Sequence, residues 1–267
     1  MINVENVQQP TTYENGGVEV VNFPEFPYFD MGQYDLYSEK DYKRFIDDTE
    51  RMVRTQSYEY RKLIEYLRNT EGMNKCTFLE NVTNIDSTKV RIEIHHSALT
   101  LYDLCSAVIC KRLHKKESME IYDVAEEILW LHYAGWVGLI PVCKTVHELI
   151  HNQFIFVPTH VIRGNYRLFI DTYHDWIDPT VLEAVEDAER VTGEYLNNPN
   201  DVSNIVNVQK AIFNQFATYI SQGDINAIPG QALERLGQAN QMLKQRISDI
   251  KNKKKTLFHV IKPVSKK

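Results

Sequence analysis

The segments VRIEIHH (residues 90–96) and VGLIPVCKTVHELIH (residues 137–151) decide the fold that we predict for the middle of this chain. In the first segment apolar residues alternate with charged ones, which is the period of a strand with one buried face. The strand ends at a histidine pair, and neighbouring strand residues point to opposite sides, so His95 and His96 are expected to face in opposite directions. The second segment predicts a short apolar strand at residues 137–142 that runs into a helix.

The helix in the second segment is expected to begin at a capping box. Thr145 is followed three residues later by Glu148, the pattern in which a hydroxyl and a carboxylate each satisfy a backbone N–H group. His147 and His151 are four residues apart, so they share one face of this helix, as a pair of chelating side chains requires.

Around the first segment, residues 76–82 and 90–94 are separated by turn-forming residues, which predicts a hairpin. Helical periodicity is found in the stretches on either side. We expect helices over residues 38–72, 99–113, 119–133, 166–176, 179–196, 202–221 and 229–251. The predicted fold class is therefore α+β and mostly helical, with a central finger of two strands and a helix between helical flanking regions.

The domain organisation follows from the same patterns. Residues 1–35 are an irregular arm, rich in aromatic residues and interrupted by prolines. The parts that follow are a helical region (36–72), a core with a helical insert (73–158), a helical C-terminal region (159–251) and a basic tail (252–267). The arm and the C-terminal helices are the segments through which we expect a protein partner to bind.

Composition limits the compartment and the partners. The formal net charge of −6 differs from the strongly basic balance of a packaging protein, so any contact with DNA must be local. The four cysteines form no CxxC pair, which favours a reduced, cytoplasmic setting. No apolar run approaches the roughly 20 residues that span a bilayer, and the polar N-terminus does not resemble a signal peptide. We therefore expect no membrane partner.

Four histidines form the candidate site. The strand end and the helix face together predict a metal site in which His95, His147 and His151 are ligands and His96 is the general base. Imidazole ligands suit zinc, nickel or manganese, and magnesium fits if water and phosphate oxygens complete its coordination. One divalent metal ion (Zn, Mn, Ni or Mg) is the expected cofactor.

The segments IEIHHSALTLYDL and GLIPVCKTVHELIHN resemble the HNH (His-Me finger, ββα-metal) endonuclease family over about residues 76–158. The resemblance implies metal-dependent hydrolysis of DNA phosphodiester bonds, with His96 activating water and His95 holding the metal. His147 and His151 would ligate the metal or contact the scissile phosphate. DNA is then the expected partner. Members with such helical flanks look like phage products that act in the host bacterial cytoplasm.

One departure from the HNH pattern supports an alternative function. The family's middle asparagine falls on Gly138, which cannot make the asparagine's side-chain hydrogen bonds. The alternative is a catalytically weak or inactive HNH-derived module that binds or regulates a protein. A third interpretation is a HExxH zinc metalloprotease, in which Glu148 is the general base and His160 or a later Glu completes the site. His132 is interpreted as one buried or surface histidine outside the site.

A possible homodimer is indicated near the C-terminus. An a/d heptad pattern with asparagine at an a position is typical of dimeric coiled coils, but a helix packed on its own domain explains it equally well. The positions are Leu233, Leu236, Asn240, Leu243, Ile247 and Ile250.

Overall fold

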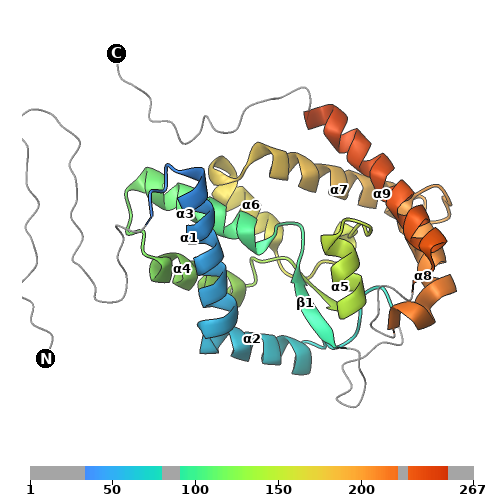
Figure 1. Cartoon of the computed structure of the whole chain (residues 1–267), viewed down its shortest axis with the longest axis horizontal. Coiled ribbons are helices and arrows are strands. Elements are labelled where there is room, and N and C mark those ends of the chain that lie inside the picture. Colours follow the sequence, from blue (N-terminus) through green and yellow to red (C-terminus); the bar gives the residue numbers. More distant parts are fainter. Residues whose placement is uncertain (1–33, 80–90, 222–227, 252–267) are drawn as a thin grey trace, which may run out of the picture. The chain divides into compact units, whose positions relative to one another are not determined.

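The computed structural model describes residues 34–79, 91–221 and 228–251 (Figure 1). The expected aromatic arm up to residue 33, the turn at residues 84–87 and the basic tail lie outside these residues. The chain divides into two compact units, Met1–Phe45 and Ile46–Lys267. In the first unit, the ring of Tyr34 meets Phe45 edge-on and Arg44 lies over Tyr34.

The fold class is confirmed, because the described residues are mostly helical and contain one small sheet. In chain order the elements are α1 (Glu39–Arg51), a π-helical turn (Met52–Gln56), α2 (Tyr58–Asn69), β1 (Ile92–His96), α3 (Leu101–Lys115), α4 (Ile121–Tyr133), β2 (Leu139–Cys143), α5 (Lys144–His151), a 3-10 turn (Thr159–Val161), α6 (Tyr166–Tyr173), a 3-10 turn (His174–Trp176), α7 (Pro179–Asn197), α8 (Ile205–Ser221) and α9 (Gly230–Lys251). Among the described helices, none contains a stretch long and apolar enough to cross a membrane.

The single helix expected over residues 38–72 is wrong, because the chain breaks at Ser57. A π-helical turn precedes this residue, whose backbone is extended, and its hydroxyl accepts a hydrogen bond from Tyr60 N at 3.0 Å. Ser57 is thus the N-cap of α2. The apolar spacing continues across the break, so periodicity alone did not indicate it.

The two strands are antiparallel, with Ile92 opposite Cys143 and His96 opposite Leu139. The hairpin between residues 76–82 and β1 is wrong for its described part. Thr77 lies in a turn, and both its N–H and its hydroxyl donate to the carbonyl oxygen of Pro141 at 2.8 Å. The partner of β1 is therefore a strand more than 40 residues away in sequence.

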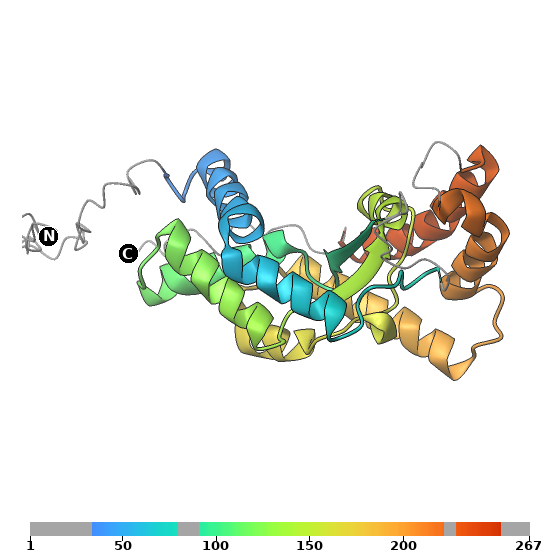
Figure 2. The same cartoon turned by 90° about the horizontal axis from the view of Figure 1, so that it is seen from below.

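Helix α5 follows β2 without a loop and packs on both strands, so β1, β2 and α5 form the predicted unit of two strands and a helix (Figures 1 and 2). The predicted capping box is wrong. The helix begins two residues earlier than the box requires, with Cys143 as N-cap and no side-chain cap. The buried hydroxyl of Thr145 has no hydrogen-bond partner among the described residues, and Glu148 lies 3.7 Å from the Lys144 ammonium.

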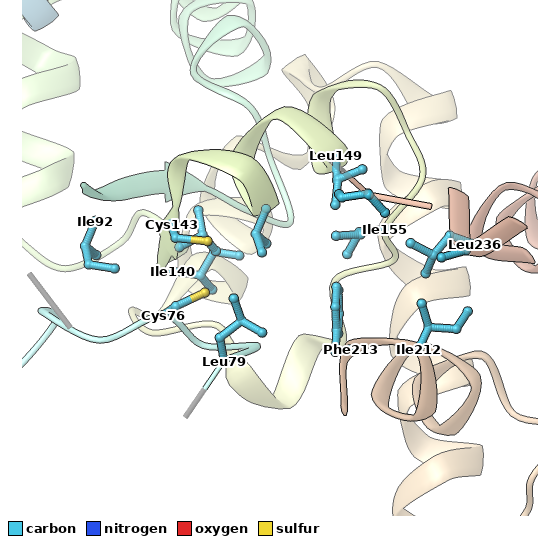
Figure 3. Packing of buried hydrophobic residues seen from close by; sticks show 14 residues of the cluster. Cys76, Leu79, Ile92, Ile140, Cys143, Leu149, Ile155, Ile212, Phe213 and Leu236 are labelled. Atoms are coloured by element: carbon cyan, nitrogen blue, oxygen red, sulfur yellow. The ribbon is translucent and has the colours of Figure 1, made fainter. Parts of the chain in front are cut away.

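One apolar cluster joins this unit to the C-terminal helices (Figure 3). Ile140 and Leu149 are fully buried in it, and Leu236 of α9 packs into the same cluster. The neighbouring Asn240 is also buried, and its side-chain amide donates to the carbonyl oxygen of Gln153. At these two heptad positions α9 therefore packs on its own chain, which contradicts the coiled-coil interpretation there; the side chains of Leu243, Ile247 and Ile250 lie outside the described part.

A partly buried ion network ties α3, α4 and α6 together. Glu127 of α4 accepts hydrogen bonds from Lys111, from Arg112 at 2.8 Å and from the Tyr173 hydroxyl at 2.6 Å. Burial alone would raise the pKa of Glu127, but the bonds from Lys111 and Tyr173 outweigh it and hold the pKa below its ordinary value. The folded state therefore favours the charged carboxylate.

We expect Glu127→Ala to lower the free energy of unfolding by about 3 kcal/mol, because two partly buried cations lose their partner. In the wild type, the stabilisation from Glu127 should be present above the carboxyl's ordinary pKa of 4.5 and lost as pH falls through the lower folded value. Chemical denaturation at pH 7 and pH 4 measures both effects. Lys62→Ala, which removes an exposed ion pair on α2, is the control and should cost less than about 1 kcal/mol. Equal effects of the two variants would contradict this account.

Candidate metal centre

The three predicted ligands come together. Strand alternation turns Glu93 and His95 of β1 toward α5, whose successive turns carry His147 and His151. One nitrogen of each histidine lies within 4.8 Å of the corresponding nitrogens of the others. The Nε2 atoms of His147 and His151 are 2.9 Å apart. It is the one group of three or more ligand-type residues that the described part of the chain places at metal-binding distance.

This donor set fits a transition metal ion. Metal–nitrogen bonds of about 2.0–2.1 Å place tetrahedral ligand atoms roughly 3.3 Å apart, which lies within the range that these nitrogens span. The other ring nitrogen of His147, Nδ1, contacts the carboxylate of Glu93. A carboxylate in this position keeps the proton on Nδ1 and leaves the Nε2 lone pair free for a metal.

Glu93 is a site residue that the sequence indicates but that was not predicted. A residue two positions before His95 in a strand must lie on the same face, and that face was already assigned to the metal. The carboxylate that was predicted to support the site, that of Glu148, does not line the cavity.

The electrostatics favour neutral imidazoles and a charged carboxylate. Burial, together with the nearby His147 and His151, lowers the pKa of His95 to about 3. Burial and His147 also lower the pKa of His151. The hydrogen bond from His147 lowers the pKa of Glu93 despite its partial burial. Near neutral pH, His95 and His151 therefore keep the lone pairs that a metal requires.

His96 lies on the opposite side of β1, as strand geometry predicted, but its surroundings differ from the prediction. Its Nε2 is 2.8 Å from Nε2 of His132, and both rings are buried. His132 Nδ1 is 2.7 Å from the carbonyl oxygen of Ile128, which can only accept, so His132 is protonated on Nδ1 and His96 donates through Nε2. Burial and the neighbouring His132 lower the pKa of His96 well below its usual range.

The ring of His96 is held in a buried pair with His132 of α4, and His96 also lines the cavity beside the three histidines, so its role as the general base stays a prediction. His132 is buried, which agrees with its interpretation as a buried or surface histidine, but its ring contacts His96, which the sequence did not predict. The sequence indicated the burial of His132 only weakly, because this residue lies on the apolar face of its helix. His132 contacts His96 only because α4 lies against the end of β1.

Gly138 has a steric role. A Cβ atom at this position would lie 2.4 Å from the carbonyl oxygen of Ser97 and 2.9 Å from the Ile162 side chain. The same close approach lets Ser97 N donate to Gly138 O at 2.9 Å and extends the pairing of β1 with β2. No side chain fits at Gly138 in this structure, while its correspondence to the asparagine of the HNH family stays a prediction.

We expect Gly138→Ala to destabilise the protein by about 2 kcal/mol or more, because backbone atoms must shift to admit the methyl group. Thermal unfolding measures the effect. Gly193→Ala in α7 is the matched control: its Cβ would meet nothing within 4 Å, and alanine favours a helix interior. The control should be neutral or stabilising. Equal stabilities of the two variants would contradict the steric role of Gly138.

A cavity of about 500 Å³ opens beside the three histidines. His95, His147 and Glu93 line one side. Residues that precede β1 in the chain line much of the rest, and several are cationic. They include Arg54, Tyr60, Arg61, Glu65, Arg68 and Arg91. A metal held by the three imidazoles would therefore face an open, positively charged space.

Residues 4–228 match the model of the Bacteriophage G278-like virion protein family. The chain belongs to this family. No curated protein and no solved structure matches the chain. Membership in the G278-like virion family supports the predicted phage origin, whereas the predicted relation to HNH nucleases remains a proposal. The family description names no activity, so the chemistry of the site is inferred from its geometry.

Proposed function

We propose that this G278-like virion protein binds one divalent transition metal ion through His95, His147 and His151 and hydrolyses a phosphodiester bond of DNA there. The observation that carries the proposal is the convergence of three imidazoles from β1 and α5 at the wall of a cavity. Three protein ligands leave a coordination position for water or substrate, as catalytic metal sites do. The family description supports the phage particle as the place where the protein acts.

The side chains at the site would have different roles in hydrolysis. Zinc, manganese or nickel suits the three imidazoles, with magnesium as a further candidate, and such an ion would polarise a phosphoryl oxygen and make water more acidic. Glu93 orients His147 through Nδ1. The nearby cavity arginines offer positive charge where negative charge increases during phosphodiester hydrolysis. His96 fixes the end of β1 through His132, so we assign water activation to the ion instead of to this residue.

One observation favours a second candidate, a metal-binding particle component without catalysis. The carboxylates and the second histidine pair beside the site are already engaged: Glu93 with His147, Glu65 with Lys62, and His96 with His132. A protein that uses the metal only to fasten α5 to β1 needs no general base. The protease alternative is weaker, because Glu148 does not line the cavity.

Cleavage of labelled DNA tests the proposal. Single-stranded and plasmid DNA are incubated with the full chain and Mn²⁺, Zn²⁺, Ni²⁺ or Mg²⁺ in turn. We expect metal-dependent cutting that His95→Ala abolishes and His174→Ala retains, since His174 lies on the surface and outside the site. Metal binding at the three histidines without cutting of either DNA would reject the nuclease and support the second candidate.

A further inference from the structure

The cavity beside the histidines holds more positive charge than its own carboxylates neutralise. Arg61 and Arg91 line it, and neither makes an ion pair with any described residue. The lining carboxylates Glu65 and Glu93 are already engaged, with Lys62 and His147. The two guanidinium groups therefore line the cavity without an ion-paired carboxylate among the described residues, although Arg91 is near enough to Glu93 to lower the pKa of that carboxyl.

Arg68 adds a buried and incompletely bonded cation. One Nη donates to the carbonyl oxygen of Ile92 at 2.8 Å, while its Nε is buried and has no hydrogen-bond partner among the described residues. Burial lowers the pKa of Arg68, and the nearby Arg91 lowers it further. An unsatisfied buried donor next to a like charge is costly, and an anion in the cavity would relieve both penalties.

Arg54 extends this positive surface to the metal ligands. Its closest carboxylate, on Glu50, is 3.6 Å away. Its charge contributes to the lowered pKa values of His95 and His151, which places the guanidinium near the metal centre. Cations therefore lie both beside the three histidines and further along the cavity.

The size of the cavity limits what can bind. A volume of about 500 Å³ accommodates a ligand of nucleotide size, in the range of typical small-molecule sites. An intact duplex does not fit, because its two paired strands with their stacked bases occupy far more space than one ligand of nucleotide size. Phosphates on one flexible strand satisfy both the charge and the volume, and arginine is well suited to bidentate contacts with phosphate.

We propose that Arg61, Arg68 and Arg91 bind the phosphates of a single DNA strand or frayed strand end and lead it to the three-histidine centre. This inference rests on the proposed function, because it names the form of DNA that the metal site would cut. The protein would therefore act on unpaired nucleotides and not on intact duplex.

Binding without metal tests the inference separately from catalysis. Fluorescence polarisation with the full chain compares a labelled eight-nucleotide dT strand with a hairpin duplex that lacks single-stranded ends. We expect at least tenfold tighter binding of the strand. Arg61→Gln and Arg91→Gln should each weaken strand binding several-fold and lower the salt-dependence slope by about 0.7, the value for one lost phosphate contact.

Arg167→Gln is the control, since this exposed arginine pairs with Glu189 away from the cavity. The exposed positions of Arg61 and Arg91 make loss of folding unexpected, and circular dichroism checks it. Equal binding of strand and duplex, or wild-type binding by both cavity variants, would overturn the inference. Metal-dependent cutting could persist in that case, whereas strand binding without any cutting would reject only the proposed nuclease function.

Discussion

Replacing His151 with alanine is expected to abolish the stabilisation that a divalent ion gives to this protein. A ligand at one hundred times its dissociation constant stabilises the folded state by about 2.7 kcal/mol if it binds only that state. For a chain of this size we expect a shift in melting temperature of roughly 5–10 °C. The site is formed by β1 and α5, which are brought together only by folding, so binding and stability must be linked.

His151 is the most informative ligand to remove because its side chain is exposed. The substitution should cost little stability without metal, so its effect on the metal-induced shift is not confounded by misfolding. Thermal melts with increasing Zn²⁺ or Mn²⁺ provide the measurement, and His174→Ala provides a surface histidine control. Wild-type shifts in His151→Ala would mean that the ion binds elsewhere.

Replacing Glu93 with alanine should weaken metal binding about 10–100-fold, although Glu93 is not itself proposed as a ligand. Its carboxylate holds the proton of His147 on Nδ1 and orients the ring. Without it the ring can rotate and change tautomer, and the ion loses part of the negative charge that stabilises it. Glu93→Gln keeps a neutral acceptor and should fall between the wild type and Glu93→Ala.

Glu65→Gln is the matched control for this prediction, because Glu65 lines the same cavity but pairs with Lys62. Calorimetric titration of the metal-free variants gives the affinities directly. Loss of a negative charge alone would weaken binding equally in Glu65→Gln and Glu93→Gln, whereas a weakened bond to His147 lowers the affinity only in the Glu93 variants, and most in Glu93→Ala. An unchanged affinity in Glu93→Ala would contradict the role assigned to this carboxylate.

Local periodicity predicted the parts of the site that depend on one element. Strand alternation placed His95 and His96 on opposite sides of β1, and four-residue spacing placed His147 and His151 on one face of α5. The mostly helical fold class followed from the same patterns. The position of Glu93 was available from this alternation as well.

The remaining features depend on contacts between distant segments, which periodicity does not reveal. The sequence predicted a hairpin between neighbouring segments, whereas β1 pairs with the distant strand β2. The interior contact between His96 and His132 likewise joins the end of a strand to a helix residue 36 positions away. The close approach at Gly138 depends on the backbone of Ser97. The net charge of the chain also did not predict the positively charged cavity, because a chain with a net charge of −6 still has several arginines that line one cavity.

The most direct test of the account is X-ray absorption spectroscopy of the full chain loaded with one equivalent of Zn²⁺, compared with the His95→Ala variant. The account predicts one ion coordinated by three imidazole nitrogens in the wild type, at about 2.0–2.1 Å, and fewer imidazole ligands in the variant. A wild-type spectrum dominated by sulfur or carboxylate ligands, or one that His95→Ala leaves unchanged, would contradict the proposed metal centre.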